Sequence, residues 1–285
     1  MLGFFRAVVR PVVLLFVLST MLNLGLTQRP KAILEQLRYR PFVLRMLLVN
    51  FVAVPLVMIL LLRLVPLDPA LQAGLLVFSV CAGAPFLIKL TQVAEHRIAL
   101  GAAVMFLLML VTVPYAPLVL PRFLAGVSVD SWAITRSLLL QLVLPTALGM
   151  ALARWVSGLA RALQPWVARV AGLTLYVVIA ATVIGYFPNM LEVVGTGAIL
   201  LLLVFIASAL GAGYWAGSGR DHYEDVGALG TAQRNTAAGL IIASQNFDDP
   251  NVLVMMTLAN IVGIVVLMFV ARRFRLDNVT RAAST

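Results

Sequence analysis

Nine apolar runs follow one another along this chain of 285 residues and occupy almost all of it. Each has about the 20 residues that an α-helix needs to cross the hydrocarbon core of a bilayer. We therefore predict an all-α integral membrane protein with nine transmembrane helices in a single domain over residues 1–285. The predicted helices cover 3–27, 41–66, 69–94, 98–124, 132–156, 165–191, 194–217, 225–247 and 251–274.

The composition supports the membrane interpretation and argues against other classes. The chain is 62% hydrophobic and 11% charged, which is too apolar for one soluble domain of this length. Its formal net charge of +10 could suggest a nucleic-acid partner, but the basic residues are spread among the loops. The sequence contains no nucleophile motif, phosphate-binding loop or metal-ligand spacing. We expect the bilayer as partner, no nucleic acid, no enzymatic activity and no bound cofactor or metal.

The loop cations predict the orientation. Of the 21 Lys and Arg residues, Lys89 and Arg234 lie inside apolar runs. Fourteen others lie on the side opposite the N-terminus, and the cytoplasmic side of a membrane protein carries the Lys/Arg excess. This places the N-terminus outside and a tail at 275–285 in the cytoplasm, and the arginine-rich usage favours a bacterial inner membrane. The five on the N-terminal side are Arg6, Arg10, Arg63, Arg122 and Arg136.

Two of the runs, 69–94 and 225–247, are interrupted in the middle by glycine, proline or polar residues, so we predict that both helices are discontinuous. Each is the third member of a four-helix set, in 3–124 and in 165–274, with 132–156 as a connector between the sets. Corresponding helices of the two sets are five positions apart in the order of the nine helices. Because five is odd, they cross the membrane in opposite directions, as in the inverted repeats of secondary transporters. Alternatively, the glycines in these runs could serve only to let neighbouring helices pack closely.

Lys89 and Arg234 lie within these two interrupted runs, and neither has an evident carboxylate partner. A charge at membrane depth is costly and points to a functional site, here for an anion. Arg234 offers a planar donor fork that suits carboxylate, sulfate or phosphate. Burial disfavours the charged form of Lys89, which could then carry a proton. The alternatives are an arginine satisfied by backbone carbonyls and a lysine that reaches the headgroups.

Five neutral residues near these cations could complete an anion site, because their side chains offer hydrogen bonds at the same depth. Each could instead serve as a polar contact between helices. They are Asn50, Thr91, Thr231, Gln233 and Asn235.

Four segments of the sequence resemble the bile acid:sodium symporter family, in its nine-helix form. They are MLNLGLT, NFVAVP, VCAGAPFLIKLTQVAEHRIALG and QRNTAAGLIIASQNF, in the order and spacing of the family. The resemblance implies two crossing discontinuous helices and a secondary transporter that carries a small organic anion by alternating access.

The chain departs from the family at the sodium sites. The resemblance implies that ligand positions of sodium-coupled members are occupied here by Leu87, Ile88, Gly101, Met105 and Gly230. Arg234 stands where the family has a glutamine, and only Asn50 and Asn235 keep polar side chains. We therefore expect transport without sodium, with Lys89 and Arg234 in place of the charge of the ion. The alternatives are a sodium-coupled symporter and a non-transporting receptor or scaffold that retains the fold.

Overall fold

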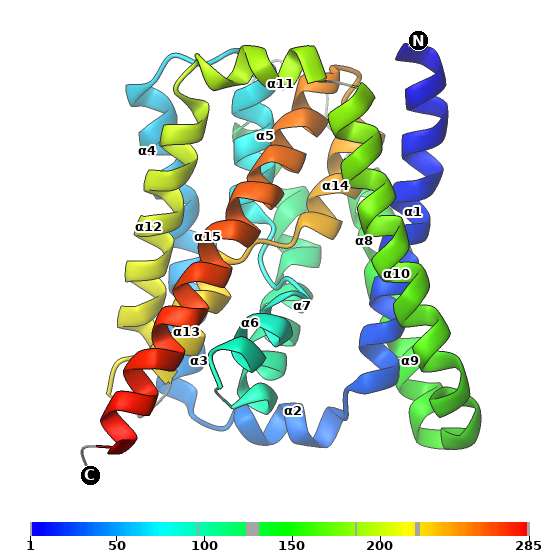
Figure 1. Cartoon of the computed structure of the whole chain (residues 1–285), viewed down its shortest axis with the longest axis vertical. Helices are drawn as coiled ribbons and strands as arrows, with labels where there is room; N and C mark the ends of the chain where they lie inside the picture. The colour runs from blue at the N-terminus through cyan, green and yellow to red at the C-terminus, as the bar shows by residue number, and fades with distance from the viewer. Residues whose placement is uncertain (1, 96, 124–130, 186, 220–222, 284–285) are drawn as a thin grey trace.

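The computed structural model describes residues 2–95, 97–123, 131–185, 187–219 and 223–283, and over these residues the chain is helical with no β-strand (Figure 1). The helices in chain order are α1 (Leu2–Thr27), α2 (Pro30–Gln36), α3 (Arg40–Leu48), η1 (Val49–Ala53), α4 (Val54–Leu64), α5 (Pro69–Val80), α6 (Leu87–Val93), α7 (Ile98–Phe123), α8 (Ser131–Leu138), η2 (Leu139–Val143), α9 (Leu144–Trp155), α10 (Ser157–Gly185), α11 (Phe187–Val194), α12 (Ala198–Gly217), α13 (Tyr223–Ala232), α14 (Thr236–Asn246) and α15 (Pro250–Ala283).

Six helices among the described residues are long and apolar enough to cross a membrane. Pro11–Thr27 of α1 and the whole of α5 are shorter apolar helices. The all-helical, membrane-type fold is therefore confirmed, while the count of nine crossings stays a prediction. The six long apolar segments are Arg40–Leu64, Ile98–Phe123, Ser131–Trp155, Ser157–Gly185, Ala198–Gly217 and Pro250–Leu276.

Two predicted boundaries are wrong. The helix predicted at 165–191 begins at Ser157 and ends at Gly185, because Pro165 lies inside α10 and Arg161 before it is exposed on the helix rather than in a loop. The short helix α11 then lies across the end of the bundle at which α1 begins (Figure 1). At the C-terminus, α15 continues to Ala283, so residues 275–283 of the predicted tail extend this helix.

Two π-helical segments, η1 and η2, each precede a proline by two residues. Pro55 has no N–H to donate to a carbonyl one turn earlier, and its ring crowds that turn. The carbonyl of Phe51 accepts a hydrogen bond from the Tyr115 hydroxyl instead, with an O···O distance of 2.6 Å. The wider π turn accommodates the proline without ending the membrane helix, and η2 stands in the same relation to Pro145.

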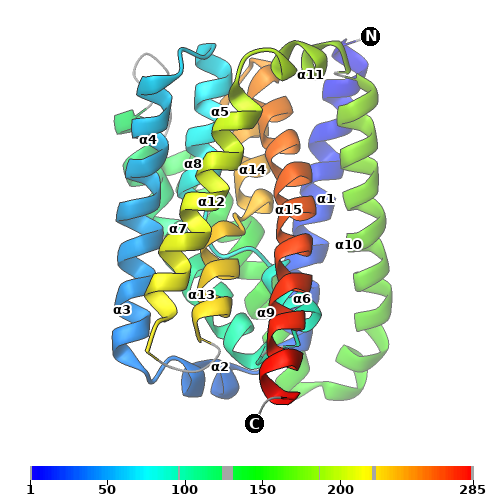
Figure 2. The same cartoon turned by 60° about the vertical axis from the view of Figure 1, so that its left-hand side comes forward.

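All the helices except α2 and α11 form two groups, which we call the panel and the core. The panel consists of α1, α8, η2, α9 and α10, and α1 packs along both α9 and α10 (Figures 1 and 2). Gly25 of α1 and Gly149 of α9 face each other so closely that a side chain on either would collide with the opposite backbone. The core consists of α3 to α7 with η1 and α12 to α15, in which α12 packs on α13 and α15 on α5.

Candidate anion site between the panel and the core

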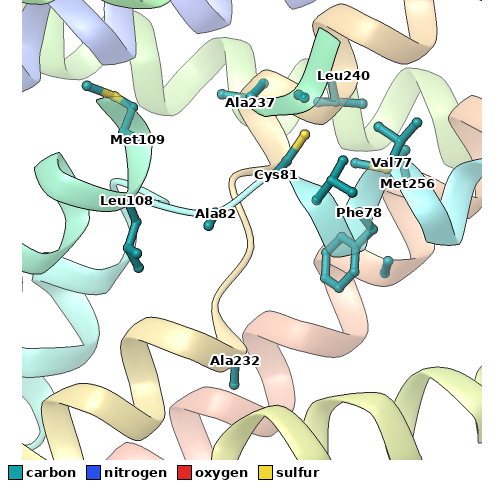
Figure 3. Close-up of a cluster of buried hydrophobic side chains, with 14 of the residues drawn as sticks. Val77, Phe78, Cys81, Ala82, Leu108, Met109, Ala232, Ala237, Leu240 and Met256 are labelled. Atoms are coloured by element: carbon teal, nitrogen blue, oxygen red, sulfur yellow. The ribbon is translucent and has the colours of Figure 1, made fainter. Parts of the chain in front are cut away.

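Two helical segments of the core are broken near the middle of the bundle, as the sequence predicts. α5 ends at Val80 before α6 begins at Leu87, and α13 ends at Ala232 before α14 begins at Thr236. Figure 3 shows the two unwound segments running past each other beside Cys81. The backbone N–H of Asn235 donates to the carbonyl of Cys81 at 2.7 Å, so the breaks are joined directly.

The unwound backbone at residues 81–83 finds partners from other helices, which buried peptide groups require. The Thr112 hydroxyl of α7 accepts from the N–H of Ala82 at 3.0 Å and donates to its carbonyl at 3.1 Å. Asn235 Nδ2 donates to the carbonyl of Gly83 at 3.0 Å, and its Oδ1 caps α14 by accepting from the N–H of Ala238 at 3.1 Å. These bonds stabilise the unwound backbone of the first break.

Gly83 has a conformation and a position that only glycine fits. Its φ is +81°, which is in the left-handed region that residues with a Cβ rarely adopt. A Cβ at this position would also collide with the backbone of Met109 in α7. The close contact between the first break and α7 therefore depends on this glycine.

Arg234 lies in the second break and is buried, with only 1% of its surface exposed. Its Nη1 donates to Asn50 Oδ1 at 3.3 Å, and its guanidinium carbon lies 5.8 Å from the centre of the Phe205 ring. Nε and Nη2 have no hydrogen-bond partner among the described residues. These two nitrogens form one edge of the planar guanidinium, the edge with which an arginine binds a carboxylate through two parallel bonds.

Asn50 of η1 orients the guanidinium of Arg234 from within the core. Its Nδ2 donates to the carbonyl of Met46 at 2.9 Å and to the Thr231 hydroxyl at 3.1 Å. Both donors of the amide are therefore used within the core, and its oxygen is left to face Nη1 of Arg234. This arrangement fixes one edge of the guanidinium and leaves the other edge unpaired.

A cavity of about 460 Å³ lies between the panel and the core and is lined by Arg234. Phe16, Thr20 and Leu175 line it from the panel, and Lys89 lines it from the core. Three of its lining residues carry buried polar atoms without a partner in the described structure: Thr20 Oγ1, Gln233 Oε1, and Nε and Nη2 of Arg234. Two cationic residues and residues with unpaired polar atoms therefore line one cavity, which suits an anion with further polar groups.

The seven residues predicted for the site separate into two groups. Arg234, Gln233 and Lys89 line the cavity. The other four lie outside the cavity wall and make hydrogen bonds inside the protein. Asn50 and Thr231 are hydrogen-bonded to each other, and Asn235 connects the two breaks. Thr91 donates to the carbonyl of Ile88 at 2.9 Å.

The expectation that Lys89 is buried is wrong. Its side chain is exposed, because the cavity separates this face of α6 from the panel. Lys89 is a charged group in the cavity wall, one turn before the end of α6 at Val93.

Several polar residues of the cavity wall were not predicted from the sequence. Thr20 and Asn23 belong to α1, Asn260 belongs to α15, and Thr236 begins α14. Thr236 donates to Asn260 Oδ1 at 2.9 Å, which connects the second break to α15. The available signal was a lone asparagine within an apolar run, as in LANIVG around Asn260.

The surroundings of Gly230 are apolar. A Cβ added there would lie 2.9 Å from a methyl carbon of Val104, 3.2 Å from one of Leu87 and 3.7 Å from the methyl carbon of Met46. Gly230 and Leu87 occupy positions at which the family resemblance implies sodium ligands. Side-chain methyl groups therefore fill the space beside Gly230.

The sequence matches the family model described as the sodium bile acid symporter family over residues 12–211. The chain belongs to this family. The resemblance to this family is thus confirmed, and with the six long apolar helices it identifies an integral membrane protein of a transporter family. The nine-helix form stays a prediction. The match includes Asn50 and Lys89 and ends before Arg234. A comparison with curated proteins found no match.

Proposed function

We propose that the chain is a secondary transporter that carries a small organic anion by alternating access, with Arg234 as the anchor for the anion. The proposal rests chiefly on one observation: Arg234 is one of the residues that line the cavity, and its buried guanidinium has two unpaired donors on one edge. An unpaired buried donor is costly, and a charged one more so. A carboxylate or a similar oxyanion would satisfy both donors at once.

The cavity wall supports an organic rather than an inorganic anion. Its volume of about 460 Å³ falls in the range of sites for small molecules, roughly 300–1,000 Å³. Phe16, Leu24, Phe86 and Leu175 line it with apolar surface, which would contact the carbon skeleton of the substrate. The unpaired Gln233 Oε1 can accept a hydrogen bond from a hydroxyl or amide group of the same molecule.

Alternating access is supported by the position of the cavity between two groups of helices. At the α2 end, Thr27, Gln28 and the exposed Lys89 line the cavity. Towards the opposite end, Ser137 of the panel donates to Gln245 Oε1 of the core at 2.7 Å. A rocking of the panel against the core would open the second end and close the first. Nine crossings and the inverted repeat of 3–124 and 165–274 remain part of this proposal.

We infer that the α2 end faces the cytoplasm, so that the cavity is open to the inside. α2, the junction of α9 and α10, and the end of α15 gather at this end (Figures 1 and 2). Arg29, Lys31, Arg154 and Arg161 lie on those elements, as the rule for cytoplasmic cations requires. In a bacterial inner membrane, the N-terminus would then be outside.

The surroundings of Gly230 and the charge of Arg234 also support transport without sodium. A bound sodium ion needs several converging oxygens, as the related calcium and magnesium sites illustrate. Here methyl groups of Leu87 and Val104 surround Gly230, and the fixed charge of Arg234 would repel a nearby cation. We propose that Arg234 supplies permanently the positive charge that the ion supplies in sodium-coupled members of the family, with Lys89 adding a second charge at the cavity wall.

Uptake into proteoliposomes tests the proposed function. A panel of labelled monocarboxylates, dicarboxylates and sulfonates would be offered, each beside its uncharged amide. We expect uptake of at least one anion by the wild type, no uptake of its amide, and loss of uptake in Arg234→Gln. Arg63→Gln, which changes an exposed arginine at the end of α4, serves as the control. Saturable binding without uptake would instead favour a receptor that retains the fold.

A further inference from the structure

A second cavity, of about 850 Å³, lies at the α2 end between the last turn of α1, α2 and the junction of α9 with α10. It meets the anion cavity only through Thr27 and Gln28, which line both. The structure describes every residue that lines this second cavity, and none of them is acidic. Its four charged lining residues, all exposed, are Arg29, Lys31, Arg154 and Arg161.

Two of these cations, Arg154 and Arg161, are carried by the adjoining ends of α9 and α10, so their spacing is set by the fold. Arg154 lies in the last turn of α9, and α10 begins two residues after that turn ends. Arg161 Nε donates to the carbonyl of Ser157 at 3.3 Å. Gln164 Nε2 donates to Asn23 Oδ1 at 3.1 Å and so joins α10 to the last turns of α1. The cavity is therefore a built basic pocket rather than a group of independent surface side chains.

Aromatic side chains place the basic pocket at the depth of the lipid headgroups. Trp155, next to Arg154, is 77% exposed, and Trp166 of α10 is 65% exposed. Exposed tryptophans gather at the boundary between bilayer and water. Leu148 of α9 and Leu159 of α10, on the two helices that carry Arg154 and Arg161, are also exposed, as expected of surface that faces acyl chains. The pocket thus adjoins water on one side and lipid on the other.

We propose that the basic pocket binds the headgroup of an anionic phospholipid. The phosphate would accept charge-assisted hydrogen bonds from Arg154 and Arg161, with Arg29 and Lys31 adding positive charge from the other wall. Basic pockets between transmembrane helices on the cytoplasmic side are suited to such headgroups. A soluble phosphate compound has the same charged group, but only a lipid would also cover exposed leucines of α9 and α10. The bound lipid would connect α2 to the panel.

Native mass spectrometry of the full-length protein, released from detergent, tests this proposal. The probes are phosphatidylglycerol, cardiolipin and the zwitterionic phosphatidylcholine, each titrated on the wild type, on the triple variant Arg29→Gln/Arg154→Gln/Arg161→Gln, and on the control Arg63→Gln/Arg122→Gln/Arg136→Gln at the other end of the bundle. Each cation near the membrane surface contributes roughly fivefold to the affinity for anionic lipid, so the triple variant should lose about 100-fold. Binding of phosphatidylcholine should be weak throughout.

Two outcomes would overturn the proposal. The first is equal binding of phosphatidylglycerol and phosphatidylcholine, or an equal loss in the control variant. The second is competition by glycerol 3-phosphate or inorganic phosphate at the concentration of the lipid, which would identify a site for soluble anions. If the triple variant fails to fold, Lys31→Glu on the exposed face of α2 replaces it. That charge reversal should weaken binding of phosphatidylglycerol by more than tenfold, and unchanged binding would contradict the account.

Discussion

Replacing Arg234 separates the contribution of its charge from that of its geometry. In Arg234→Gln, the anion loses two charge-assisted hydrogen bonds, from Nε and Nη2, each of which contributes about 1.5–3 kcal/mol. The lower bound, about 3 kcal/mol, corresponds to roughly a 150-fold weaker affinity. Arg234→Lys keeps the charge but not the second parallel bond, so we expect a loss of about 1.5–2 kcal/mol, or roughly 10- to 30-fold.

The assay is equilibrium binding of a labelled monocarboxylate, first identified by uptake, to purified protein in detergent. Its uncharged amide should bind weakly to the wild type and be almost unaffected by either substitution, because it cannot use the paired donors. Thermal unfolding checks that each variant is folded, and Arg63→Gln controls for the loss of a charge elsewhere. An Arg234→Gln variant that binds the anion within threefold of the wild type would refute the assignment of the anchor.

Three further predictions concern other residues. Lys89→Met should raise the KM for the anion about two- to fivefold and reduce its dependence on salt, because an exposed charge acts by long-range attraction; initial uptake rates at several ionic strengths check this. Asn235→Ala should lower stability by about 2–4 kcal/mol, because it removes the cap of α14 and leaves the Gly83 carbonyl unpaired; denaturant unfolding measures this. Gln245→Ala removes the acceptor of the Ser137 hydrogen bond between the panel and the core. This substitution should increase labelling of the cavity by a membrane-impermeant reagent added from the end near α11. Unchanged labelling would argue against a role of this hydrogen bond in closing that end.

The helices and the two breaks could be predicted from the sequence because they depend on local features. A run of apolar residues can cross a bilayer only as a helix, and interruptions such as Pro85 and Gly83 disrupt that helix wherever it packs. The start of α10 at Ser157 is harder to predict, because Arg161 interrupts the apolar pattern in its first turns. An arginine on a membrane helix can reach the headgroups, so a charge near the interface does not mark the end of a helix.

The candidate site was predicted only in part, because its arrangement depends on how the two breaks meet. Asn235 and Arg234 are neighbours in sequence, yet the unwound chain brings the side chain of Asn235 to Gly83 and the guanidinium of Arg234 to Asn50 and Phe205. Thr20 and Asn260 come from helices far apart in the sequence, and no local pattern indicates that both line the same cavity. Whether a charged side chain is buried likewise depends on packing, as the exposed Lys89 illustrates.

The sodium dependence of anion binding tests the central claim most directly, which is that the fixed charge of Arg234 replaces a bound cation. The affinity for the labelled anion would be measured in sodium chloride, potassium chloride and choline chloride at equal ionic strength. We predict that the three values agree within about twofold, because methyl groups fill the space beside Gly230. A tenfold or larger gain in affinity that only sodium produces would contradict the account.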